Sequence, residues 1–130
     1  MSGVLFISPH SEDGSRLSQM LGSLPFVFKH VERPGHARRD LESCRFSVIL
    51  TEATLADGNW TDVLDLARDV LPGAEVIVTD RFADGRLWSE VLNRGAYDLL
   101  AQPFEAPEVR RILSNACSRW IPEEHAHAAV

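Results

Sequence analysis

Short runs of apolar, strand-favouring residues recur along the chain, separated by spacers long enough to form a helix. The five runs cover residues 4–7, 26–31, 48–50, 76–78 and 97–100. Regular alternation of such runs with amphipathic spacers is typical of proteins in which strands and helices follow one another. The pattern therefore predicts five strands that alternate with five helices.

Helix start and stop signals mark the spacers. Ser11 is a candidate N-cap for the first helix, and Asn59 is a candidate N-cap for the third. The fourth helix should cover roughly residues 84–94 and end at Gly95, where a left-handed residue is often required. Pro107 suits the first turn of the fifth helix.

The third and fourth runs are almost wholly apolar, so helices should cover both faces of the sheet. Right-handed crossovers then predict an α/β fold, a (βα)5 doubly wound parallel sheet of flavodoxin-like topology with strand order 2-1-3-4-5. A chain of 130 residues, 45% of them hydrophobic, can bury one core without disulfides or metal. We expect one domain over residues 1–120 and a flexible tail over residues 121–130.

Composition narrows the classes of partner. The formal net charge of -6 disfavours a nucleic-acid partner, which would require clustered Lys and Arg. No apolar run approaches the length of a membrane span, and the N-terminus lacks the basic flank of a signal peptide, so we expect a cytoplasmic protein. Cys44 and Cys117 have no metal-ligand spacing and should be buried, reduced thiols.

Ligands of an open parallel sheet gather beyond the carboxyl ends of its strands. In this chain those ends should place six residues around one depression. They are Ser8, Pro9, His10, Glu52, Thr79 and Gln102.

The span over residues 4–116 resembles the receiver domain of bacterial response regulators, the proteins of two-component phosphorelay signal transduction. The resemblance rests on the strand spacing and on the segments VILTEATLADGN, EVIVT and GAYDLLAQPF. It implies a non-enzymatic, stand-alone signalling domain, because only about ten residues remain for an effector after the fifth helix.

The match to a working receiver is partial. In such receivers the first strand ends in two acids that hold magnesium, the third in the phosphate-accepting aspartate, the fourth in Ser or Thr, and a Lys-Pro follows the fifth. The residues at these positions are, in the same order, Ser8 and Pro9, Glu52, Thr79, and Gln102 with Pro103. Only the threonine and the second proline are unchanged, so the resemblance is to a degenerate pseudo-receiver with a vestigial phosphoacceptor pocket.

The substitutions weaken phosphotransfer. Mg²⁺ prefers an octahedral oxygen shell with carboxylates, and the pocket offers only Glu52 with neutral groups, so we expect no cofactor and no catalytic residue. Gln102 carries no charge to neutralise a transferring phosphoryl group. The extra methylene of Glu52 would displace the attacking oxygen by about 1.5 Å, and a misplacement of about 1 Å costs about 100-fold.

Two interpretations of Glu52 stay open. Its extended carboxylate could imitate phosphoaspartate and reach Thr79, which would fix the domain in one signalling state. Alternatively, Glu52 is a polar residue at a solvent-facing strand end. The position of the switching aromatic in receivers falls on Leu99, which suggests a weakened coupling to Thr79. By strand alternation we place Tyr97 on a different face from Leu100.

With phosphotransfer doubtful, protein contact becomes the expected mode of action. The resemblance points to the face of the fourth helix, fifth strand and fifth helix, where Trp88, Tyr97, Leu99 and Trp120 are the candidate contacts. The expected partners are a histidine kinase, a downstream regulator or a second copy of the chain. Trp60 could cover the pocket or meet a partner there, or it could staple its loop to the third helix.

Other functions stay open beside this one. The main alternative is an active receiver that accepts phosphate from a histidine kinase, with His10, Glu12 or Asp13 recruiting Mg²⁺. A flavodoxin-type flavin carrier shares the fold class but would need a phosphate cradle in the first loop. A hydrolase built on Ser8 and His10 lacks a nucleophile elbow and an orienting acid.

Overall fold

A five-stranded parallel sheet forms the centre of the molecule. The computed structural model describes residues 2–22, 24, 26–43 and 46–118. The sheet has the order β2-β1-β3-β6-β7, which confirms the predicted order 2-1-3-4-5. Its strands are β1 (Ser2–Ile7), β2 (Phe26–Val31), β3 (Val48–Glu52), β6 (Glu75–Asp80) and β7 (Asp98–Ala101).

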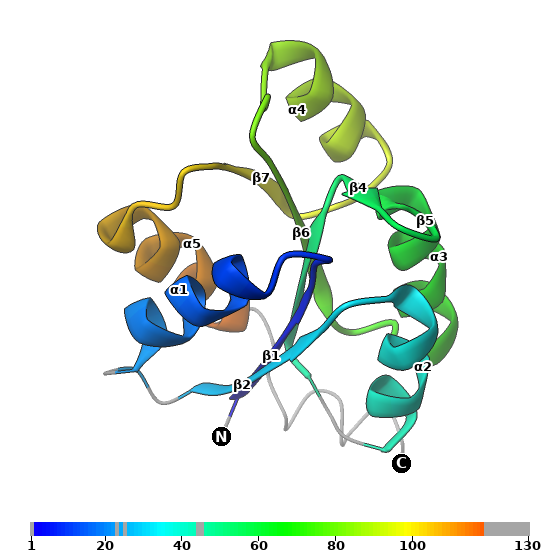
Figure 1. Ribbon diagram of the computed structural model, residues 1–130. Coiled ribbons are helices and arrows are strands. Elements are labelled where there is room, and N and C mark those ends of the chain that lie inside the picture. The colour runs from blue at the N-terminus through cyan, green and yellow to red at the C-terminus, as the bar shows by residue number, and fades with distance from the viewer. Residues whose placement is uncertain (1, 23, 25, 44–45, 119–130) are drawn as a thin grey trace.

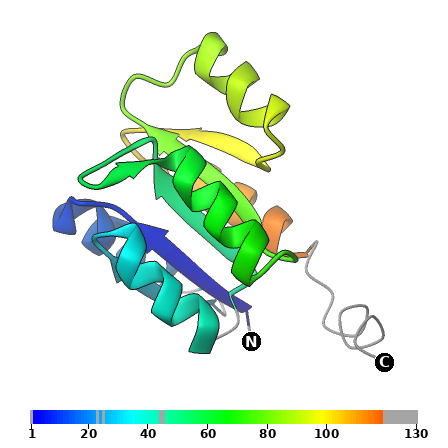
Figure 2. The same cartoon turned by 90° about the vertical axis from the view of Figure 1, so that its right-hand side faces the viewer.

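Helices cover both faces of this sheet, as the sequence predicts. They are α1 (Ser11–Leu21), α2 (Pro34–Ser43), α3 (Trp60–Val70), α4 (Gly85–Asn93) and α5 (Ala106–Ser118). Figures 1 and 2 show α1 and α5 on one face and α2 and α3 on the other, with α4 standing at the β7 end of the sheet.

Strand alternation divides the core between the two faces. Val4 and Phe6 of β1 pack in the layer of α1 and α5, whereas Leu5 and Ile7 pack in the layer of α2 and α3. All four of these side chains are fully buried. A strand that is buried on both faces cannot show polar alternation, which explains the continuous apolar runs in the sequence.

The ends of the helices follow their local chemistry, with one exception. Asn59 and Asp62 form a reciprocal capping box at the start of α3, and Gly95 adopts a positive φ of 95° just beyond α4. The prediction for Ser11 is wrong, because Ser11 is already helical and His10 occupies the N-cap without a side-chain capping bond. The hydroxyl that orders this turn belongs to Ser8, which accepts the amide of His10 at 3.0 Å.

A small ribbon that the sequence did not predict leads into α3. Its two short strands, β4 (Thr54–Leu55) and β5 (Gly58–Asn59), pair antiparallel. Trp60 follows directly and is 5% exposed, packed in the layer of α2 and α3. Trp60 therefore staples the loop to the core and does not cover the pocket.

Several predictions concern the cysteines and the C-terminal region, which the structure describes only in part. Cys117 is buried and accepts a hydrogen bond from Ser47 at 3.4 Å, as expected of a packed thiol. Cys44, Trp120 and the tail over residues 121–130 lie outside the described residues, so the boundary at residue 120 stays a prediction. Within the described part of the chain, no helix is long and apolar enough to cross a bilayer.

Candidate functional site at the carboxyl edge of the sheet

Four polar side chains meet beyond the carboxyl ends of the central strands. Ser8 follows β1, Glu52 ends β3, Thr79 lies near the end of β6 and Gln102 follows β7. Their residues are 0%, 6%, 0% and 9% exposed, in that order. The structure therefore brings together the residues that the sequence places around one depression, and it buries them.

Glu52 is the centre of a hydrogen-bond network. Ser8 Oγ donates to Glu52 Oε2, and Gln102 Nε2 donates to Glu52 Oε1 at 3.0 Å. The same amide nitrogen donates to Thr79 Oγ1 at 3.3 Å. A buried carboxylate without donors is strongly unfavourable, so these two neutral donors stabilise Glu52 where it stands.

This geometry contradicts one of the two interpretations of Glu52. Glu52 is buried, so it is not a polar residue left at a solvent-facing strand end. Its carboxylate connects to Thr79 through the amide of Gln102 and makes no direct hydrogen bond to the threonine. The polar network is continuous from β1 to β7.

The mouth of the site is formed by His10 and the two prolines. His10 is exposed, and its Nε2 lies 3.9 Å from Glu52 Oε2. Pro9 is half-buried, whereas Pro103 is exposed and follows a cis peptide bond from Gln102. An exposed imidazole therefore lies near Glu52 in addition to its two buried donors.

His30 on β2 holds the backbone of Ser8 through a hydrogen bond, a role that the sequence did not reveal. Its Nε2 donates to the carbonyl oxygen of Ser8 at 2.8 Å, and its ring lies 5.5 Å from that of Phe6, centroid to centroid. Gly14 of α1 makes room for this ring, since a Cβ there would lie 2.7 Å from His30 Nδ1. A glycine inside a helix is unfavourable, so Gly14 is the sequence signal of this close approach.

Solved structures with the same architecture are numerous. The signal receiver domain of a putative LuxO repressor protein from Vibrio parahaemolyticus has a TM-score of 0.84 at 22% identity, with 91% of each chain covered. The beryllofluoride-activated NtrC4 receiver domain dimer also has a TM-score of 0.84, at 21% identity, and the match covers 91% of this chain and 98% of the NtrC4 chain. The signal receiver domain of an HD domain-containing protein from Pseudomonas fluorescens Pf-5 has a TM-score of 0.80 at 22% identity, with 98% of both chains covered.

This chain has the fold of a receiver domain. No protein-family model and no curated protein matches the sequence, so the likeness lies in the three-dimensional structure. These matches cover 91% to 98% of the chain.

The residues of this receiver fold do not suit a magnesium ion. Ser8 and Pro9 supply no carboxylate beside Glu52, and both Glu52 oxygens already accept hydrogen bonds from neutral donors. Mg²⁺ binds through one or two carboxylates in a near-ideal octahedral shell. In the part of the chain that the structure describes, no three His, Cys, Asp or Glu side chains are grouped so that they could hold a metal ion.

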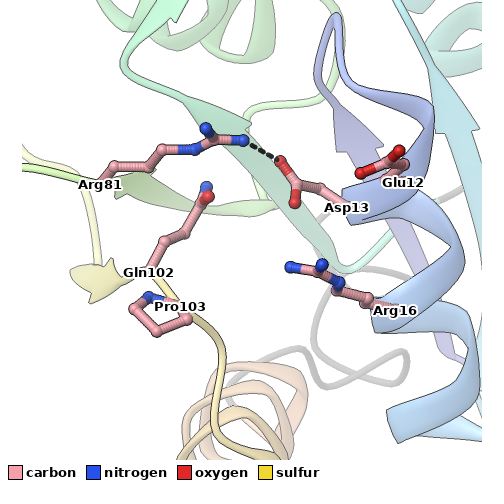
Figure 3. A pocket seen from close by; sticks show the side chains of 6 residues that line it. All are labelled: Glu12, Asp13, Arg16, Arg81, Gln102 and Pro103. Carbon is pink, nitrogen blue, oxygen red and sulfur yellow. Dashed lines mark ion pairs between the residues drawn. The ribbon is translucent and has the colours of Figure 1, made fainter.

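A second polar group lies beside this network, on α1 and the loop after β6. Asp13 is 3% exposed, and Arg81 reaches it from the loop with Nη2 3.6 Å from Asp13 Oδ2. Figure 3 shows Arg81 reaching toward Asp13 across a hollow. Gln102 and Pro103 line the hollow on the side opposite α1. The sequence suggested Asp13 as a helper for metal and gave no signal for Arg81.

The expected contact face is only partly exposed in the receiver fold. Trp88 on α4 is 49% exposed, whereas Tyr97 and Leu99 are half-buried and pack in opposite helix layers. The placement of Tyr97 is wrong, because it packs in the same layer as Leu100. Tyr97 precedes β7 and so does not follow that strand's alternation.

The most exposed apolar side chain near this face was missed. Phe82 lies in the loop between β6 and α4 and is 84% exposed. Among the described residues, Trp88 on the following helix is also a large exposed aromatic. Nothing in the local sequence separates an exposed Phe from a buried one, because burial depends on how the loop crosses the sheet edge.

Proposed function

We propose that this chain is a cytoplasmic, receiver-like module of two-component signalling that acts through protein contacts and does not accept phosphate. One observation carries the proposal. Glu52, at the position of the phosphate-accepting aspartate in receivers, is buried with each carboxylate oxygen bonded to a neutral donor, Ser8 or Gln102.

The energetics of phosphotransfer argue in the same direction. A nucleophilic Glu52 would have to give up a hydrogen bond in a buried site, at a cost of about 1–3 kcal/mol. Cations normally neutralise the charge that spreads over the transferring phosphoryl oxygens. Gln102 supplies an amide in place of the lysine, and Ser8 supplies a hydroxyl in place of an acid, so this site offers little to stabilise the transition state.

The same network gives the module a fixed conformation. The amide of Gln102 donates to both Thr79 and Glu52, so the hydroxyl at the switching position is linked through Gln102 to the carboxylate at the phosphoacceptor position. Leu99 packs half-buried in the layer of α2 and α3 and has no hydroxyl with which to answer Thr79. We infer that the module persists in one signalling state.

The exposed aromatics Phe82 and Trp88 supply the contact, and the partner we propose is a second copy of this chain. Aromatic side chains are enriched at interface cores because they desolvate a large rigid surface at low entropic cost. The similar NtrC4 structure is described as a receiver domain dimer, which supports self-association as the form of this contact.

Beryllofluoride, the phosphate analogue named for that NtrC4 structure, provides the test. Beryllofluoride and Mg²⁺ are added to the native chain and to a Ser8→Asp, Glu52→Asp, Gln102→Lys variant, and backbone amide shifts are followed by NMR. The proposal expects no shift at Glu52 or Thr79 of the native chain and clear shifts in the variant. Saturable shifts at both native residues would instead support an active receiver.

A further inference from the structure

A polar hollow lies beside the Glu52 network at the same edge of the sheet. Its volume is about 390 Å³, within the range of small-molecule sites. Figure 3 shows α1 on one side and the segments that follow β6 and β7 on the other. The lining residues are Glu12, Asp13, Arg16, Arg81, Gln102 and Pro103.

Asp13 lines the hollow and carries a buried carboxylate oxygen that accepts no hydrogen bond from the described residues. Its side chain is 5% exposed, and among the described residues no group donates a hydrogen bond to its Oδ2. The Arg81 guanidinium stands 3.6 Å away, which is too far for a hydrogen bond. A buried carboxylate oxygen without a donor is unfavourable by several kcal/mol, so this oxygen calls for a donor that enters from the hollow.

The remaining charges decide what kind of donor fits. Arg16 extends into the same space as Asp13 and Arg81, and both guanidinium groups are exposed. The two arginines balance Glu12 and Asp13, so the hollow has no net formal charge. A ligand with only a positive charge would be repelled by the two arginines, and a ligand with only a negative charge would be repelled by the two carboxylates.

We propose that this hollow binds a small zwitterion of the amino-acid class, with its ammonium group on Asp13 and its anionic group between Arg16 and Arg81. An ammonium that donates to Asp13 Oδ2 replaces the distant Arg81 as the counter-charge. Arg81 is then free to form a charge-assisted bond with the anionic end of the ligand. Asp13, Arg16 and Arg81 each face a group of opposite charge in this arrangement.

The site adjoins the network that the proposed function uses, although it does not depend on that function. Gln102 forms a wall of the hollow and also donates to Glu52 and Thr79. A ligand against Gln102 can therefore change the strength of that network. The module would then respond to a bound small molecule at the same edge of the sheet at which receivers are phosphorylated.

The test is an NMR titration of the native chain at low ionic strength. The probes are glycine, β-alanine and γ-aminobutyrate, with methylammonium and acetate as their separate halves and Mg²⁺ as a competing ion. We expect saturable amide shifts confined to the first turn of α1, Arg81 and Gln102 with at least one zwitterion. Its affinity should be at least about tenfold above that of either half, which corresponds to one charge-assisted contact.

Variants separate this site from general charge effects. Asp13→Asn and Arg16→Gln should each weaken zwitterion binding by about 10-fold or more, whereas Asp65→Asn, an exposed change on α3, should not. Because Arg16 is exposed, its variant stays folded even if the Asp13 variant does not. No binding of any zwitterion, equal binding of methylammonium, acetate or Mg²⁺, or binding unchanged in Arg16→Gln would overturn the proposal.

Discussion

Gln102 binds Glu52 through its amide nitrogen, 3.0 Å from Glu52 Oε1, across the gap between the ends of β7 and β3. The resemblance to receivers aligns these two residues with the lysine and the aspartate of working receivers. In this chain a neutral donor meets a carboxylate there, and both carboxylate oxygens accept a hydrogen bond because Ser8 donates to the second one.

The two donors to Glu52 predict the cost of altering it. Glu52→Gln keeps the shape but turns one oxygen into an NH2 group that must face the Ser8 hydroxyl or the Gln102 amide. We expect a loss of about 1–3 kcal/mol in the free energy of unfolding, measured by urea denaturation. Glu90→Gln, an exposed change on α4, is the control and should lie within about 0.5 kcal/mol of the native chain. Equal stability of the two variants would show that the network contributes nothing.

The contact between Gly14 and His30 predicts an unusual glycine. Gly14→Ala should destabilise the chain by about 1–3 kcal/mol, because the new Cβ would lie 2.7 Å from His30 Nδ1. Gly35→Ala in α2 has no atom within 4 Å of its new Cβ and should be neutral or stabilising by up to about 1 kcal/mol. Thermal unfolding of both variants checks the contrast.

A second comparison tests whether His30 causes that cost. In Gly14→Ala, His30→Ala the clash is removed, so the added alanine should cost at least about 1 kcal/mol less than it does beside the native histidine. If Gly14→Ala costs the same in both backgrounds, the close approach of His30 is not what requires the glycine.

The exposed aromatics predict a self-association that depends on one face. Phe82→Ser with Trp88→Ala should raise the dimer dissociation constant by at least about tenfold, because these are the large apolar side chains exposed there. Val27→Ser removes a 53% exposed side chain on the β2 edge and should leave the dissociation constant unchanged. Sedimentation equilibrium measures both. A native chain that stays monomeric at high concentration contradicts the proposed partner.

Sequence reasoning succeeded where local chemistry decides the structure. The apolar runs predicted the strands because strands covered on both faces must be continuously apolar, and Asn59 and Gly95 mark helix ends through their own backbone preferences. The carboxyl-end rule also brought Ser8, Glu52, Thr79 and Gln102 to one place.

It failed where the outcome depends on packing between distant segments. Glu52 is buried beside its donors Ser8 and Gln102, and the buried Asp13 faces Arg81, which reaches it from the loop after β6. Tyr97 and Phe82 depend in the same way on where β7 begins and how the loop after β6 turns. None of these is encoded in a local pattern of residues.

The most direct test of the central claim is intact-mass measurement after incubation with acetyl phosphate and Mg²⁺. The native chain is compared with the Ser8→Asp, Glu52→Asp, Gln102→Lys variant, which restores an acid, the shorter acceptor and the lysine. We expect no phosphoryl adduct on the native chain and a labile one on the variant. A labile adduct that maps to Glu52 of the native chain would contradict the central claim and establish an active receiver.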